Sequence, residues 1–233
     1  MIGPYLPNMR KIDKSDAAIL STQYRDWEQD LEKKGTAHPA YNSSKHRYYI
    51  DIVMNLLHCQ NGLCAYTEVE LCALEDISVE KWSNGRYLSK EKINYGALDH
   101  FDEKLKYKEN DPNSACKDWL WSNFFVVHSD TNNRKGAKPV DYLIKPDSED
   151  YDPFKLLEYS PLTHKYVANP DIEEESVRLR ITKMIEVLGL NAPKNLVDKR
   201  RTIIERALRY GTDANEREFP TAFEFYKKHE QYQ

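Results

Sequence analysis

The segment "NFFVVHSDTNNRKGAK", residues 123–138, joins the most apolar short run of the chain to a polar, basic stretch that contains a glycine. The run "FFVV" has the aromatic and β-branched composition of a strand. Asn123 precedes the run and Asn132 follows it, with a histidine and an aspartate between the run and Asn132. Polar side chains of this kind at the end of an apolar strand indicate a candidate site.

Composition limits the class of protein. The chain has 233 residues, of which 40% are apolar and 31% charged, which suits a globular protein of one or two domains. It contains no run of apolar residues long enough to span a membrane and no apolar core of signal-peptide length at its start, so we expect a cytoplasmic protein with no membrane partner and with reduced cysteines. The net charge of -4 counts against an autonomous DNA-binding protein.

Apolar periodicity predicts an α+β fold, mainly helical, in which helices enclose a small mixed unit. We expect an N-terminal helical region at 1–62, a core at 63–145 and a C-terminal helical region at 146–233, together forming one compact unit. The acidic, proline-bearing stretch at 145–154 is the best candidate for a linker. The expected helices are 15–33, 44–59, 171–188, 195–210 and a short one in the tail; a hairpin is expected at 156–168, and strands at 63–71, 86–88, 97–101 and 123–128.

The sequence "LDHFDEK" lies about twenty residues upstream of the apolar strand and supplies Asp99 and His100. Hydrolysis of a phosphodiester needs a group that takes a proton from water, for which a neutral histidine is suited. A hard cation such as Mg²⁺ needs oxygen ligands, which an aspartate and an asparagine provide. A second asparagine can hold the histidine in one tautomer. Adjacent strand residues point to opposite faces, so Asp99 and His100 can act together only where the strand is irregular or ends.

The order Asp-His, then Asn, then Asn-x-x-Lys resembles the HNH (ββα-metal) endonucleases. The resemblance implies that His100 is the general base with Asn123 as its orienting partner, and that Asp99 and Asn132 bind Mg²⁺ or Mn²⁺. It implies a phosphate-facing or structural role for Lys135. We also expect His100, at a polar strand end, to contribute little core burial, so that His100→Ala folds normally.

The segments "GLCAYTE", "MRKIDKS" and "VLGLNAPKNLVDKRRTII" resemble the PtuB-like nuclease subunit of Septu anti-phage systems, some of which accompany retrons. The resemblance covers most of the chain. It implies a nuclease in anti-phage defence that works with a PtuA-like ABC ATPase, and in some systems with a retron reverse transcriptase and its small DNA–RNA hybrid product (msDNA). The nucleic-acid substrate that it implies is DNA, or RNA such as a transfer RNA.

One departure concerns zinc. HNH proteins of this group commonly carry two C-x-x-C pairs that bind a structural zinc ion. The corresponding positions here are Cys64, Thr67, His128 and Thr131, and threonine is a poor zinc ligand. We therefore expect a degenerate zinc ribbon without zinc, in which Cys64 is a small buried side chain and His128 is a core histidine or a remnant of the metal site.

Two alternatives stay open. Each residue of the set has a structural explanation by itself, since Asn123 can cap a strand and Asn132 can belong to a turn. The protein can also be a catalytically silent adaptor, which keeps the ββα fold in order to bind the ATPase and whose degenerate zinc site signals lost activity. Within the nuclease class, a site that contacts mainly phosphate does not decide between DNA and RNA.

Overall fold

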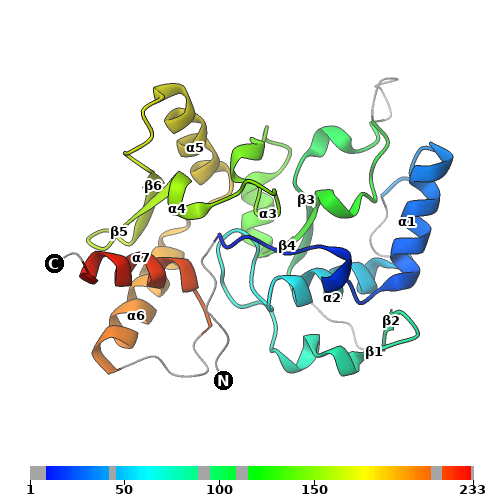
Figure 1. Ribbon diagram of the computed structural model, residues 1–233, viewed down its shortest axis with the longest axis horizontal. Helices are drawn as coiled ribbons and strands as arrows, with labels where there is room; N and C mark the ends of the chain where they lie inside the picture. Colours follow the sequence, from blue (N-terminus) through cyan, green and yellow to red (C-terminus); the bar gives the residue numbers. More distant parts are fainter. Residues whose placement is uncertain (1–8, 42–45, 89–94, 109–114, 211–216, 232–233) are drawn as a thin grey trace.

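Two short antiparallel strands, β3 (Ala97–His100) and β4 (Phe124–Val127), lie near the centre of the computed structural model, and the short helix α3 (Ser129–Lys135) follows β4 directly (Figure 1). In the register of this hairpin, Asp99 lies opposite Phe125 and His100 lies opposite Phe124. The structure describes residues 9–41, 46–88, 95–108, 115–210 and 217–231.

Helices and two small β-ribbons lie on both sides of this unit (Figure 1). The N-terminal side is formed by α1 (Thr22–Lys34), α2 (Tyr49–Cys59), β1 (Trp82–Ser83) and β2 (Arg86–Tyr87). The C-terminal side is formed by α4 (Pro153–Leu156), β5 (Leu157–Ser160), β6 (Lys165–Ala168), α5 (Glu175–Val187), α6 (Lys194–Tyr210) and α7 (Pro220–Gln231). Each sheet in the described residues is a two-stranded antiparallel pair, so the predicted α+β class is confirmed.

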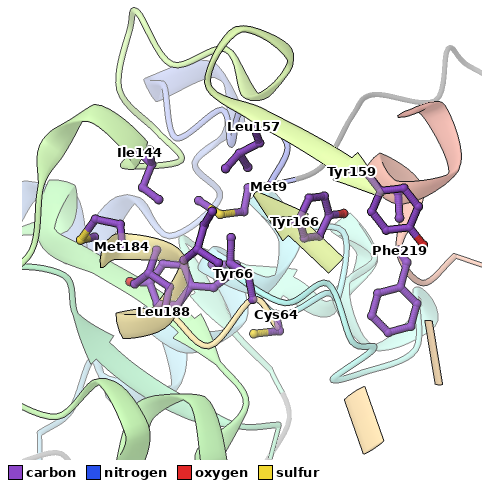
Figure 2. Close-up of a cluster of buried hydrophobic side chains, with 14 of the residues drawn as sticks. Met9, Cys64, Tyr66, Ile144, Leu157, Tyr159, Tyr166, Met184, Leu188 and Phe219 are labelled. Carbon is purple, nitrogen blue, oxygen red and sulfur yellow. The ribbon is translucent and has the colours of Figure 1, made fainter. Parts of the chain in front are cut away.

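The β3–β4 hairpin separates two clusters of buried apolar side chains. Alternation along the strands sends Phe125 and Val127 into one cluster and Phe124 and Val126 into the other. The first cluster reaches from Met9 to the C-terminal helices, and Figure 2 shows part of it. The second cluster contains α2 and the tryptophans of residues 119–121. The hairpin is therefore buried on both faces, which explains why "FFVV" is apolar without alternation.

Several predicted elements differ from the structure. The predicted helix 15–33 divides into a 3-10 turn at Asp16–Ala18 and α1. The predicted strand at 63–71 forms turns with one isolated bridge, and Glu68 within it has a φ of 62°. The predicted helix 44–59 begins at Tyr49, and part of its expected first turn lies outside the described residues.

The stretch at 145–154 packs against the core and does not form an exposed linker. The side chain of Asp147 is 6% exposed, and its carboxylate lies 2.6 Å from Nζ of the buried Lys14. Tyr151 is buried in the first cluster. An acidic composition therefore misled the linker prediction, because Asp147 pairs with Lys14 of the N-terminal segment and Tyr151 packs in the core. The boundaries at 62 and 145 stay predictions.

Candidate functional site

Asp99 lies on the face of the hairpin that α3 covers. Its carboxylate accepts hydrogen bonds from the Tyr66 hydroxyl at 2.6 Å and from Lys135 Nζ at 3.0 Å, one on each oxygen. Asp99 is only 2% exposed, and burial raises the pKa of its carboxyl group, although Lys135 and Tyr66 act in the opposite direction. Both oxygens of the predicted metal ligand are thus already bonded.

Lys135 is fully buried at the end of α3. Its ammonium group donates to Asp99 Oδ1 and, at 2.6 Å, to the main-chain carbonyl of His100. This geometry fits the structural alternative for Lys135, because the ammonium group ties α3 to β3 and does not reach solvent. A contact between Lys135 and a substrate phosphate stays a prediction that requires the Asp99 ion pair to open.

His100 lies on the opposite face of the hairpin, between aromatic rings. Its ring centroid is 4.6 Å from Tyr41, at an interplanar angle of 86°, and 4.7 Å from Phe124. The side chain is 3% exposed, so the expectation that it contributes little burial is wrong. Strand β3 stays regular through His100, and for this reason Asp99 and His100 do not converge on one point.

One hydrogen bond defines the tautomer of His100. Nε2 lies 2.9 Å from the main-chain carbonyl oxygen of Asp118, and a carbonyl oxygen can only accept. Nε2 therefore carries the proton, and Nδ1 keeps its lone pair. Burial and the charge of nearby Lys106 lower the pKa of His100 to about 3, so the ring is neutral at pH 7.

Asn123 occupies the turn that precedes β4, and its amide does not bond to His100. Its Oδ1 accepts from Asp102 N at 2.8 Å, and its Nδ2 donates to Asp102 O at 3.0 Å. The predicted hydrogen bond from Asn123 to His100 is thus wrong in this structure. The Asp118 carbonyl orients the imidazole, while Asn123 closes the loop that follows β3.

Asn132 lies on α3, half-buried, three residues before Lys135 and therefore on the same side of the helix. In the described residues the structure gives it main-chain hydrogen bonds, to His128 O and from Gly136 N, and none from its side chain. Its amide oxygen is available, but Asp99 is not. No group of three or more histidine, cysteine, aspartate or glutamate side chains in the described part of the chain is arranged to hold a metal ion. While Asp99 is bonded to Lys135 and Tyr66, only the amide oxygen of Asn132 is open in this pair, and one such oxygen does not hold Mg²⁺ or Mn²⁺.

The four positions of the degenerate zinc ribbon do come together. Thr67, His128 and Thr131 line one cavity of about 200 Å³, and Cys64 Sγ accepts from His128 N at 3.3 Å. The imidazole of His128 caps α3, where Nδ1 accepts from Asp130 N at 3.3 Å. One thiol and one imidazole do not form a tetrahedral zinc site, so these residues do not fit structural zinc. The lack of zinc stays a prediction.

Two side-chain contacts, from Tyr66 and Tyr41, and one carbonyl, that of Asp118, are not predicted by the sequence. Tyr66 was noted only as part of "GLCAYTE", and Tyr41 and Asp118 were not singled out. The number of residues between "CAY" and the hairpin does not predict the hydrogen bond from Tyr66 to Asp99. The carbonyl of Asp118 has no sequence signature, since any residue supplies one.

Comparison with known proteins does not assign the chain to a family. No model of a protein family matches the chain, and no curated protein matches it. Among the described residues, no helix has the length and apolar character needed to cross a bilayer.

Proposed function

We propose that β3, β4 and α3 form the ββα unit of an HNH endonuclease that hydrolyses phosphodiester bonds of DNA or RNA in anti-phage defence. The proposal includes dependence on Mg²⁺ or Mn²⁺, association with a PtuA-like ABC ATPase and, in retron-linked systems, with a reverse transcriptase and its msDNA. Asp99 and His100 lie on β3, Asn123 lies in the turn before β4, and Asn132 lies on α3, in the same order along the chain as in the resemblance.

The observation that carries the proposal is the hydrogen bond from His100 Nε2 to the Asp118 carbonyl. It leaves Nδ1 unprotonated, and a neutral imidazole of fixed orientation is the form that accepts a proton from water. The Asp118 carbonyl orients the His100 imidazole, which is the role that the resemblance assigned to Asn123. The role of Asn123 becomes that of a positioning residue, which holds the loop after His100.

Two changes must accompany activity. A base with a pKa of about 3 is poorly matched to proton abstraction at pH 7, so His100 must become hydrated. The ion pair between Asp99 and Lys135 must also open before Asp99 can serve as a ligand. The same burial of Asp99 and His100 is the observation that favours the second candidate function, a catalytically silent adaptor that binds the ATPase.

A cleavage assay separates the two functions. The substrates are supercoiled plasmid and transfer RNA, each with Mg²⁺ or Mn²⁺, with and without the ATPase subunit. We expect His100→Gln to lose about 10²–10⁴-fold in rate, because glutamine can donate to the Asp118 carbonyl but does not act as a base.

His58→Ala is the matched control, because His58 Nδ1 also lies within hydrogen-bond distance of a main-chain carbonyl, that of Ile77 at 3.0 Å. We expect this variant to cleave as the wild type does. No cleavage by the wild-type complex on either substrate, with ATPase binding intact, would favour the adaptor. Equal cleavage by wild type and His100→Gln would remove His100 from the site.

A further inference from the structure

The segment that covers His100 is short and irregular. Residues 36–41, called the arm here, follow α1 and contain no helix or strand. Most of the arm is exposed, and two side chains point inward: His38, which is buried, and Tyr41, which is half-buried. The arm is thus a surface segment with two inward side chains, His38 and Tyr41.

Tyr41 is the anchor that touches the candidate base. Its ring meets the His100 ring edge-on at 4.6 Å and lies 5.0 Å from the ring of Trp119. Phe124 covers His100 from the hairpin itself. Tyr41 is itself half-buried, and Nζ of Lys106 lies 5.4 Å from the centroid of its ring, so the ring lies between His100 and a partly exposed surface.

The polar contacts that the structure gives the arm link it to residues 116–119 and to the end of α1. His38 N donates to Cys116 O at 2.8 Å, Trp119 N donates to His38 Nδ1 at 3.0 Å, and Trp119 Nε1 donates to Pro39 O at 2.8 Å. The side chain of Glu32, at the end of α1, pairs with His38 Nε2 at 2.7 Å. Local opening of such a segment needs much less free energy than opening of the hairpin, which is buried on both faces.

The Asp118 carbonyl does not depend on the arm alone. Asp118 Oδ2 accepts from Tyr107 N at 3.0 Å, and the Trp119 carbonyl accepts from the Tyr24 hydroxyl at 2.8 Å. The orienting hydrogen bond to His100 can therefore persist when the arm leaves. Removal of the cover would hydrate the ring without changing its tautomer.

We propose that the arm is an autoinhibitory cover: Tyr41 keeps water and substrate from His100, and displacement of residues 36–41 opens the site. The inference rests on the proposed function for the role of His100, but the cover itself is a property of the structure and can be measured without cleavage. Displacement of the arm would hydrate His100, which is the first of the two changes that activity requires.

Amide hydrogen exchange of the wild-type protein is the first test. The amide of His38, bonded to Cys116 O, should exchange faster than amides of the β3–β4 ladder, because it opens with the arm alone. Equal protection of His38 and the ladder amides would mean that the arm opens only on global unfolding, which would overturn the proposal.

Reactivity of His100 toward diethyl pyrocarbonate, followed by mass spectrometry, is the second test. Tyr41→Ala should raise the modification rate of His100 roughly tenfold or more, a change typical of a shifted opening equilibrium. Tyr41→Phe keeps the covering ring, so its His100 should react much more slowly than that of Tyr41→Ala. Tyr49→Ala removes a half-buried tyrosine that packs against the same cluster and controls for general loosening.

The outcomes distinguish the cover from the proposed function. Faster modification of His100 in Tyr41→Ala together with faster nucleic-acid cleavage supports both. Faster modification without any cleavage supports the cover and contradicts the nuclease. A folded Tyr41→Ala protein with unchanged His100 reactivity overturns the cover, whatever its cleavage rate.

Discussion

The two faces of the β3–β4 hairpin bury adjacent polar residues in opposite ways. On one face Asp99 is held by an ammonium group and a phenol, Lys135 and Tyr66. On the other face His100 is neutral, surrounded by aromatic rings and held by one carbonyl. A buried charge needs a charged partner, whereas a neutral imidazole needs one hydrogen bond and can sit among apolar groups. Strand alternation alone creates this difference between neighbours.

Replacement of Lys135 by Met should produce the largest loss of stability. The substitution leaves Asp99 as a buried carboxylate with a single hydrogen bond from Tyr66, and breaking a buried ion pair in this way costs about 3–5 kcal/mol. Urea denaturation measures the free energy of unfolding.

One control variant and one double variant complete that measurement. Lys138→Met alters an exposed lysine just beyond α3 and should change stability by less than about 0.5 kcal/mol. Adding Asp99→Asn to Lys135→Met should recover part of the loss, because no unpaired charge remains. If Lys135→Met lowers the free energy of unfolding no more than Lys138→Met does, Asp99 does not need its charged partner, and this difference between the two faces is absent.

The aromatic face should respond to acid. Burial lowers the pKa of His100 from 6.5 to about 3, so the unfolded chain binds a proton that the folded protein refuses. The contribution of His100 to the free energy of unfolding is therefore fully present above pH 6.5 and is lost as the pH falls toward 3. Between pH 6.5 and 4.5 this amounts to about 2–3 kcal/mol, at about 1.4 kcal/mol per pH unit.

Buried acids such as Asp99 have raised pKa values and act in the opposite direction, so the quantity to measure is a difference. The free energy of unfolding of wild type minus that of His100→Gln, determined across this pH range, isolates the histidine. A difference that stays constant with pH would show that His100 is not buried as a neutral ring.

The smallest effect concerns the asparagines at the ends of the unit. Asn123→Ala should cost about 1–3 kcal/mol, because it leaves the N–H and C=O of Asp102 without their partner. Asn132→Ala should change stability by less than about 0.5 kcal/mol, since its side chain makes no hydrogen bond in the described residues. Thermal unfolding of both variants checks this, and a reversed order would show that the loop is not held by Asn123.

Periodicity predicted most of the elements. The apolar run gave β4, and the spacing of Ile181, Met184, Ile185 and Leu188 gave α5, because these side chains do bury one face. The hairpin predicted at 156–168 is also present, as β5 and β6. The segment at 63–71 was not, because its apolar residues pack from turns and its conformation is set by contacts such as the bond from Ala65 N to Val126 O.

The candidate site was predicted as a set of residues but not as a geometry. The sequence predicted that Asp99, His100, Asn123 and Asn132 converge. In the structure they lie on β3, in the turn before β4 and on α3, and Asp99 and His100 occupy opposite faces of the hairpin. The sequence left open whether Lys135 faces phosphate or is structural, because a lysine in a basic run is usually solvated; in the structure this side chain turns inward. Nor could it predict which group orients His100, since the partner is a main-chain carbonyl and the cover, Tyr41, lies far away in the sequence.

The tautomer and charge of His100 are the most direct test of this account, and long-range ¹H–¹⁵N correlation NMR measures both. We predict a neutral ring with the proton on Nε2, unchanged on titration down to at least pH 4.5 in the folded wild-type protein. A ring protonated at both nitrogens near pH 6, or a proton on Nδ1, would contradict the account. It would mean that the Asp118 carbonyl does not hold His100 and that the aromatic face is open to water.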